Sequence, residues 1–325
     1  MVMLKEVVLL FSSALLTIRC ESPCSLLGKQ TGKNVTDATS NYSVRIYDCF
    51  LFNDEVDMLE IRLNEMGPWI DYFVLLESSL TFTKLSKRKV YSEVRERFQQ
   101  FEEKIIYLSV DSFPDNGDSW SNERFLRDYL FQGLRQEGKL ARKGDYILVS
   151  DVDEIIRPIF LKSLKTCTGF DNTHVRFSMQ LSYYSYTWVY PHERWNNVIA
   201  FPFDPLQVNA TSAHKMRFNA KAATLTIQDA GWHCSYCFRY LRQFREKLNS
   251  FSHTEFNSRN KPKIHTREHL VNSIRLGQDL LARNIYKIQF SESIDAPKYV
   301  LANPVRFSYL LERRGPSAEL ADFLE

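Results

Sequence analysis

The segment that decides the fold is Gly144-Asp145-Tyr146-Ile147-Leu148-Val149-Ser150-Asp151-Val152-Asp153-Glu154-Ile155. Its apolar run of four residues ends in three acids within the next five positions. A short apolar run bounded by polar residues is typical of a strand that is buried on both faces of a parallel sheet. The acids would then lie at the carboxyl end of that strand, which is the edge of an open α/β sheet where ligands bind.

Two interpretations of the acids remain open at this point. Asp151 and Asp153 point the same way if the chain stays extended. Two carboxylates so placed can hold a hard divalent cation, and the cation can in turn hold a diphosphate. The alternative is an acidic loop that caps the following helix.

Length and composition set the class of protein. The chain has 325 residues, of which 44% are hydrophobic and 14% aromatic, enough for one large α/β domain or two small ones. Its 42 basic and 39 acidic residues give a net charge of +3, which is too small to indicate a nucleic-acid partner. We therefore expect no nucleic acid among its ligands.

The amino-terminal region predicts entry into the secretory pathway. Residues 7–18 are mainly apolar and follow Lys5, as in a signal peptide, and the run is short for a membrane span of roughly 20 residues. We expect residues 1–19 to be a signal peptide or a short membrane anchor, with membrane contact only through this segment if it is uncleaved. Residues 20–43 are rich in small polar side chains and predict a flexible stem, and residues 44–325 predict the folded domain.

The first half of that domain alternates between strands and helices. The patterns predict strands at 45–52, 72–76, 105–110 and 146–149 and helices at 56–65 and 122–136. This alternation predicts a doubly wound, mostly parallel sheet with helices on both faces. In the second half we expect aromatic strands within 177–190, an irregular stretch at 191–203, a strand at 224–227, and helices at 238–251 and 270–284.

Polar side chains follow several of the predicted strands, and parallel strands end at one edge of a sheet. We expect a nucleotide-binding edge there, although turns favour Asp and Asn in any case. The residues concerned are Asp48, Asn53, Glu55, Glu77, Asp151 and Asp153.

The segment Gly231-Trp232-His233-Cys234-Ser235-Tyr236-Cys237 contains a Cys-x-x-Cys pair. Such a pair can be half of a zinc site, a redox couple or part of a structural disulfide. Because the sequence holds no second Cys-x-x-Cys, we favour the disulfide. His233 is either a ligand of the same divalent cation or a polar core residue.

Three further groups have two interpretations each. His253 and Glu255 can act as a base with its orienting group, or they can form a solvated turn. A basic stretch can face a diphosphate or solvent, and three aromatic residues can stack on sugars or belong to the core. The basic residues are Lys261, Lys263, Arg267 and Arg275, and the aromatic residues are Tyr184, Trp188 and Trp195.

Taken together, the sequence resembles glycosyltransferase family 17, which includes the enzymes that add the bisecting N-acetylglucosamine. The resemblance covers roughly residues 45–311. Its blocks are 47–65 with 74–78 and 81–83, 150–155 with Glu123 and Arg127, 231–235 with 252–255, and 296–299.

The resemblance implies a glycosyltransferase A-type fold and an inverting enzyme of the Golgi lumen. Its implied donor is UDP-GlcNAc, its implied cofactor is Mn²⁺ or another divalent cation, and its implied acceptor is the β-linked core mannose of an N-glycan on a glycoprotein. The alternatives are a transferase with another nucleotide sugar or acceptor, and a non-catalytic glycan-binding protein.

The resemblance also suggests roles for single residues. The implied metal ligands are Asp151, Asp153 and His233. The implied donor-binding residues are Asn53, Glu77, Glu123, Arg127 and Asp151. The implied catalytic base is Glu255, with His253 beside it and Glu154 as the second choice.

Overall fold

The computed structural model describes residues 22–38, 44–114, 117–169, 173–206, 212–218, 225–283 and 287–314. The leader expected at residues 1–19 lies outside these ranges. Within them, no helix combines the length and the apolar character that crossing a bilayer would require.

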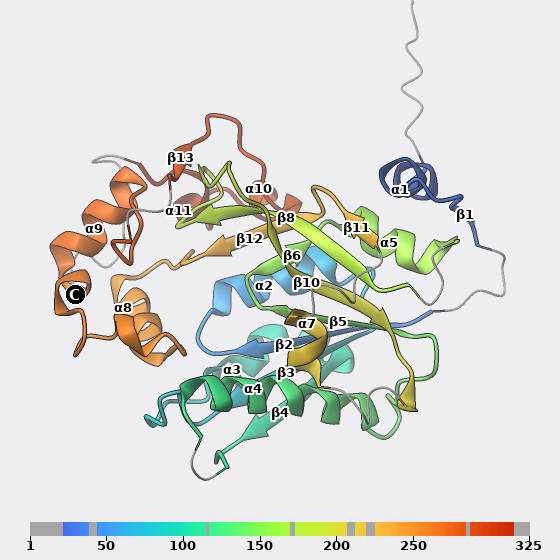
Figure 1. Ribbon diagram of the computed structural model, residues 1–325, viewed down its shortest axis with the longest axis horizontal. Coiled ribbons are helices and arrows are strands. Elements are labelled where there is room, and N and C mark those ends of the chain that lie inside the picture. The colour runs from blue at the N-terminus through green and yellow to red at the C-terminus, as the bar shows by residue number, and fades with distance from the viewer. Residues whose placement is uncertain are drawn as a thin grey trace, which may run out of the picture.

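A central sheet organises the chain, as Figure 1 shows. Its parallel part has the order β4 (Ile105–Val110), β3 (Tyr72–Ser78), β2 (Ile46–Phe52) and β5 (Tyr146–Asp151). The sheet continues through β10 (Trp195–Pro202), antiparallel to β5, and then β8 (Val175–Tyr183), antiparallel to β10. The prediction of an α/β fold whose first half forms a parallel sheet is therefore confirmed.

Beyond β8 the sheet curls into a smaller mixed part. Strand β12 (Gly231–Ser235) runs parallel to β8 and antiparallel to β6 (Glu154–Ile156), which follows β5 directly. The short strands β9 (Trp188–Val189), β11 (Leu225–Ile227) and β13 (Gln289–Phe290) complete it. This arrangement brings the 231–235 segment next to the acidic turn after β5.

Helices cover both faces of the parallel strands. On one face, α2 (Val56–Met66) and α5 (Pro158–Thr166) pack on a core that includes Phe50 and Leu148. On the other, α4 (Ser119–Tyr129) and η2 (Leu130–Arg135) pack on Val74 and Ile147. A Cβ atom at Gly133 would lie 2.4 Å from Val74 Cγ1, so η2 needs a glycine to lie this close to the sheet.

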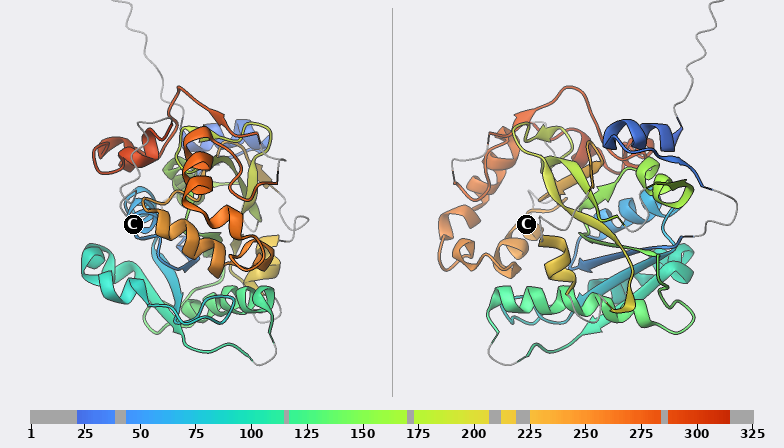
Figure 2. Two further views of the ribbon diagram at one scale, coloured as in Figure 1. Left: turned by 90° about the vertical axis from the view of Figure 1, so that its left-hand side faces the viewer. Right: turned by 45° about the vertical axis from the view of Figure 1, so that its right-hand side comes forward.

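The remaining helices lie around this framework. Figures 1 and 2 show α8 (Leu241–Ser250) and α9 (Arg267–Leu276) beyond the carboxyl ends of β2 and β3. These two pack around a third hydrophobic cluster. The others are α3 (Val90–Val94), η1 (Arg95–Lys104), α7 (Ala213–Phe218), η3 (Thr254–Phe256), η4 (Pro262–His265), α10 (Lys298–Ala302) and α11 (Ser308–Leu311).

The prediction of a flexible stem at residues 20–43 is wrong for the part that the structure describes. Ser22 caps α1 (Pro23–Thr31), whose Leu27 is fully buried in the main core. A disulfide joins Cys24 to Cys167, and β1 (Thr36–Asp37) pairs with β7 (Cys167–Thr168). A cross-link and a buried apolar side chain attach this segment to the domain.

Two other expectations need correction. The stretch expected to be irregular at 191–203 contains β10, because Val198 to Phe201 are buried between β5 and β8. The helix expected at 270–284 ends at Leu276, because Gly277 follows it with a φ of +62°, the left-handed conformation of a helix C-cap.

Candidate active site

A cavity of about 490 Å³ lies at the carboxyl edge of the parallel strands. Leu51 near the end of β2 pairs in register with Asp151 at the end of β5, so the turns after both strands border the cavity. Its other walls come from α4, from α8 and the residues after it, and from β12. Segments far apart in sequence therefore meet where the parallel sheet predicted a ligand site.

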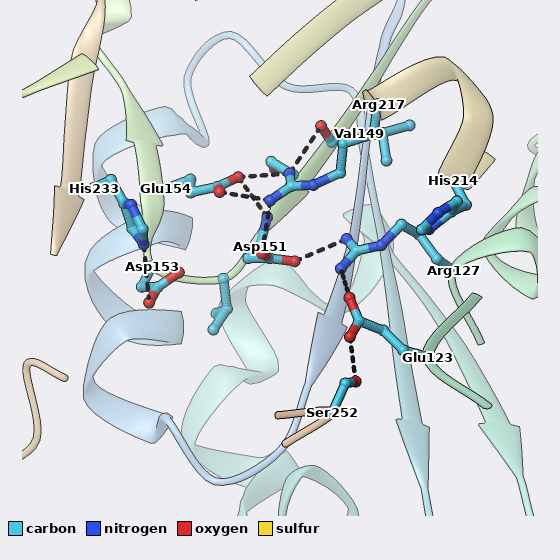
Figure 3. A network of polar contacts seen from close by, with 12 residues as sticks. Glu123, Arg127, Val149, Asp151, Asp153, Glu154, His214, Arg217, His233 and Ser252 are labelled. Atoms are coloured by element: carbon cyan, nitrogen blue, oxygen red, sulfur yellow. Dashed lines mark hydrogen bonds and ion pairs between the residues drawn. The ribbon is translucent and has the colours of Figure 1, made fainter. Parts of the chain in front are cut away.

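Asp151 is held by two arginines from different helices (Figure 3). Its Oδ1 accepts a hydrogen bond from Arg127 of α4 at 2.8 Å, and its Oδ2 accepts one from Arg217 of α7 at 2.6 Å. Burial alone would raise the pKa of Asp151, but these two guanidinium groups hold it well below the usual range. Asp151 is therefore ionised, and both of its oxygens already have cationic partners.

Glu154 lies at the centre of the same network and has no exposed surface. Its carboxylate accepts two hydrogen bonds from Arg217, at 2.6 and 2.7 Å, and a third from the indole nitrogen of Trp195. It also accepts a hydrogen bond from the backbone N–H of Asp151. The proposal of Glu154 as a second-choice base is not supported, because the side chain is buried, fully paired and absent from the cavity wall.

Arg62 of α2 holds the backbone of the acidic turn at residues 151–154 through hydrogen bonds. Its guanidinium donates to the carbonyl oxygens of Asp151 at 2.9 Å and Glu154 at 2.7 Å, and it forms a buried ion pair with Asp48 at 2.5 Å. The expectation that Asp48 belongs to the nucleotide-binding edge is wrong. Asp48 lies inside β2, fully buried, and orients Arg62 instead of facing the ligand.

Asp153 also lines the cavity, but the neighbour of its carboxylate is His233 of β12 instead of two arginines (Figure 3). Asp153 Oδ2 lies 3.6 Å from His233 Nε2, longer than an ordinary hydrogen bond. Burial would lower the pKa of His233, but the charge of Asp153 raises it above the usual value. The ring also lies against Trp195, with centroids 4.3 Å apart.

These two side chains fit a divalent cation better than the pair of aspartates does. A carboxylate oxygen and an imidazole nitrogen at this separation can bind one ion, whereas both Asp151 oxygens are occupied by arginines. Among the described residues, no three His, Cys, Asp or Glu side chains gather closely enough to hold a metal by themselves. A cation here would need further oxygens from a substrate or water, as is usual for cations bound to diphosphates.

Glu123 connects α4 with the segment after α8. It accepts a hydrogen bond from Arg127 at 2.9 Å, and its other oxygen accepts one from the hydroxyl of Ser252. Ser119 also donates to the carbonyl of Ser252 at 2.8 Å. Ser252, Glu123, Arg127 and Asp151, which come from three separate sequence blocks, thus form one continuous polar network (Figure 3).

The cavity contains cations that sequence reasoning missed. Lys247 of α8 lies 3.1 Å from Glu55 Oε1; burial would lower its pKa, but Glu55 and Asp153 raise it, so it stays charged. Lys87 and Arg283 also line the wall. The basic stretch that had two interpretations in the sequence does not line the cavity. Its residues are Lys261, Lys263, Arg267 and Arg275.

Lys247 has one detectable signal in the sequence. It lies one position before Leu248 and three after Phe244, both of which are fully buried. A lysine at the border of an apolar helix face can extend its ammonium group into a neighbouring polar cavity. Ser252, five residues later, belongs to a segment that the sequence already places at the site. Arg217 gives no comparable signal.

The expected donor residues divide into two groups. Asn53, Glu123, Arg127 and Asp151 line the cavity. Glu77 is fully buried and outside it, where its carboxylate accepts hydrogen bonds from the Tyr91 backbone N–H and the Tyr107 hydroxyl. Burial raises the pKa of Glu77, and its contacts assign it to the packing of β3, β4 and α3.

His253 and Glu255 lie at the outer rim. Glu255 Oε1 is 2.8 Å from His253 Nδ1, and both side chains are about half exposed. His253 lines the cavity, as does Trp120, whose ring centroid is 4.6 Å from that of His253. Despite the effect of burial, the hydrogen bond from His253 lowers the pKa of Glu255.

The Cys-x-x-Cys pair and the three aromatic residues also have defined places in the structure. Cys234 and Cys237 form a disulfide, as favoured over a zinc site. Tyr184 and Trp188 are buried in the third hydrophobic cluster, while Trp195 both lines the cavity and contacts His233.

Comparisons with known proteins show which family the chain resembles. A family described as Glycosyltransferase family 17 matches residues 17–315. The chain is similar to the β-1,4-mannosyl-glycoprotein 4-β-N-acetylglucosaminyltransferases of Rattus norvegicus and Homo sapiens, each at 26% identity over 300 residues and 82% of this chain. These alignments cover 54% and 55% of the relatives, so the chain spans about half their length. Among solved structures, the mannosyltransferase PcManGT from Pyrobaculum calidifontis, in complex with GDP-Man and Mn²⁺, matches with a TM-score of 0.37 and 14% identity, over 86% of this chain and 76% of that one.

Proposed function

The chain belongs to glycosyltransferase family 17, and from this membership we propose that it transfers N-acetylglucosamine from UDP-GlcNAc to the β-linked core mannose of an N-glycan, with inversion at the anomeric carbon. The names of the relatives support the sugar and the acceptor. The observation that carries the proposal is the cavity at the sheet edge, where Asp153 and His233 face an open space beside Lys247.

Asp153 and His233 would hold a divalent cation such as Mn²⁺, which supplies positive charge for the leaving diphosphate. Asp151 acts differently in this proposal. Its ion pairs with Arg127 and Arg217 fix the turn that carries Asp153, so it positions a ligand instead of binding the metal itself.

Lys247 would contact the diphosphate directly. Its ammonium group is anchored by Glu55 on one side and lines the cavity that Asp153 faces. A fixed cation in a partly enclosed site stabilises developing negative charge without reorganisation during the reaction. Asn53, in the turn after β2, would contact the nucleoside, and Arg127, buried and paired with Asp151 and Glu123, would shape the wall formed by α4.

Inversion needs a base for the acceptor hydroxyl, and His253 with Glu255 is the pair we propose. The hydrogen bond from Nδ1 of His253 to Glu255 would leave Nε2 free to take the proton at the rim of the cavity. The two disulfides, Cys24–Cys167 and Cys234–Cys237, favour an oxidising compartment. We accordingly propose action in the Golgi lumen.

The test is a mass-spectrometric transfer assay with UDP-GlcNAc and a panel of N-glycans, with and without Mn²⁺. We expect one added N-acetylglucosamine that depends on the cation and is lost in Asp153→Asn. Asp111→Asn is the matched control, because Asp111 is an exposed aspartate paired with Lys89 and outside the cavity. Full transfer by Asp153→Asn would contradict the site, and transfer of another sugar would contradict the donor. Binding of N-glycans without any transfer would favour a glycan-binding protein.

A further inference from the structure

A second and larger cavity, of about 800 Å³, adjoins the proposed donor cavity. It lies between the amino-terminal end of α2, the residues before α3, and α8. Asn53, Glu55, Thr81, Lys87 and Ser250 line both cavities and so form a shared wall. The proposed transfer reaction gives this space no role.

Its lining carries more basic than acidic side chains. In the described part of the chain, seven Lys and Arg side chains line it against four Asp and Glu side chains. Two of the arginines, Arg97 and Arg306, have their N–H groups engaged by Asp57 and Glu60. Their charge is therefore neutralised locally, and they contribute little to ligand recognition.

Arg239 and Arg242 are arranged differently. The Arg242 guanidinium lies over the ring of Tyr240 at 4.6 Å, and that of Arg239 over the ring of Tyr309 at 5.5 Å. Within the described ranges, neither side chain has a carboxylate partner. Stacking uses the flat face of a guanidinium and orients it, while the N–H donors at its edge stay available for a planar anion.

A third cation lies on the shared wall. The ammonium nitrogen of Lys87 is shielded from solvent and has no hydrogen-bond partner among the described residues. Burial lowers the pKa of Lys87, although the nearby carboxylates of Glu77, Glu55 and Asp54 raise it. An anionic ligand that accepts a hydrogen bond from this ammonium would stabilise its charged form. Lys87 and the two stacked arginines thus offer donors to an anion in the same cavity.

We propose that this cavity binds the anionic group, a carboxylate or a phosphate, of a saccharide. This inference rests on the proposed function in one respect: the shared wall would allow a glycan bound in the second cavity to reach the donor cavity. Specificity for an acidic branch would then come from Arg239 and Arg242, separately from the residues that hold the nucleotide.

Titration calorimetry with saturating UDP, which occupies the donor cavity, tests the proposal. Sialyllactose and mannose 6-phosphate represent the two sources of negative charge, and lactose and mannose are their neutral counterparts. We expect at least about tenfold tighter binding of one acidic probe than of its neutral counterpart, and loss of that difference in the Arg239→Gln/Arg242→Gln double variant. Arg194→Gln is the matched control, because Arg194 is an exposed arginine outside both cavities.

Equal binding of acidic and neutral probes, or an unchanged preference in the double variant, would overturn the proposal. Thermal unfolding of each variant verifies that it is folded. UDP affinity and transfer to a neutral N-glycan, measured in the same variants, separate the two proposals. If both persist while the acidic preference is absent, only the second site is wrong.

Discussion

Asp151 and Asp153 lie two residues apart and both line the cavity, yet their carboxylates have different partners. Arg127 and Arg217 occupy both oxygens of Asp151, whereas the neighbour of Asp153 is His233, at 3.6 Å. The difference arises because β5 ends at Asp151 and the chain then turns into β6. Two acids with the spacing of a metal-binding pair therefore have different roles: Asp151 is paired with arginines, and the Asp153 carboxylate lies beside His233.

The first prediction concerns the buried pair of Arg217 and Glu154. Arg217→Met should destabilise the fold by about 3–5 kcal/mol, because it leaves Glu154 charged and without its main partner in a site with no exposure. Urea unfolding measures the change, and Arg194→Gln should stay within about 0.5 kcal/mol of wild type. An equally small effect of Arg217→Met would show that the network does not support the site.

The second prediction concerns Lys247. Lys247→Gln should weaken UDP binding by about tenfold or more, since it removes a charge-assisted contact to the diphosphate. Lys261→Gln, which changes the same charge outside the cavity, should bind UDP as wild type does. Uridine without phosphates provides the decisive comparison, and an equal loss of uridine affinity would contradict a contact to the diphosphate.

The third prediction concerns Glu255, the proposed partner of the base His253, and separates a role in catalysis from a role in donor binding. Glu255→Gln should lower turnover by about 10²-fold or more while leaving UDP-GlcNAc affinity unchanged, because the residue lies at the rim and outside the cavity wall. Single-turnover kinetics and donor titration measure the two quantities. Loss of donor affinity with unchanged turnover would assign Glu255 to binding.

The parallel half of the fold could be predicted because its signals are local. Each strand there is a short apolar run, and α2 has helical spacing of its buried side chains. Strand β10 escaped prediction because Trp195 to Asn197 are partly exposed and a register shift separates Trp195 from Val198. Its burial depends on pairing with β8 and with β5, where Ile199 lies beside Val149 from 50 residues earlier in the chain.

The candidate site could be predicted only in part for the same reason. The position of Asp153 follows from the strand that precedes it, whereas the environment of Asp151 depends on Arg217, 66 residues later. Asp48 and Glu77 also have partners that spacing does not reveal, namely Arg62 and the Tyr91 backbone. The positions of the strand ends predicted where a ligand can bind. Which acid is free to bind that ligand depends on the partner of each acid, and these partners are distant in sequence.

The fourth prediction concerns the disulfide between Cys24 and Cys167. It closes a loop across 143 positions and attaches α1 to the domain, so a Cys24→Ser/Cys167→Ser variant should lose about 2–5 kcal/mol of stability. Protease sensitivity should rise first between residues 22 and 38, measured by mass spectrometry of limited digests. Unchanged sensitivity there would show that Leu27 and the β1–β7 pairing hold α1 without the cross-link.

The last prediction is a pH dependence that originates at Asp54. Burial, together with the charges of Glu55 and Glu246, raises the pKa of Asp54 to about 7, against opposing effects that include Lys247. Lys87 is a further charged neighbour. The folded state thus binds this proton more tightly than the unfolded state, whose aspartate pKa is about 3.9.

Ionisation of Asp54 therefore lowers the free energy of unfolding as the pH rises. The stabilising contribution of protonated Asp54 is complete below about pH 4 and is lost as the pH rises toward 7. Asp54→Asn cannot ionise, so its stability relative to wild type should increase between about pH 4 and 7, by about 2–4 kcal/mol, and then level off. Urea unfolding across this range measures the difference, with the exposed Asp111→Asn expected to run parallel to wild type. Parallel curves for Asp54→Asn as well would mean that Asp54 is ionised in the folded protein throughout this range.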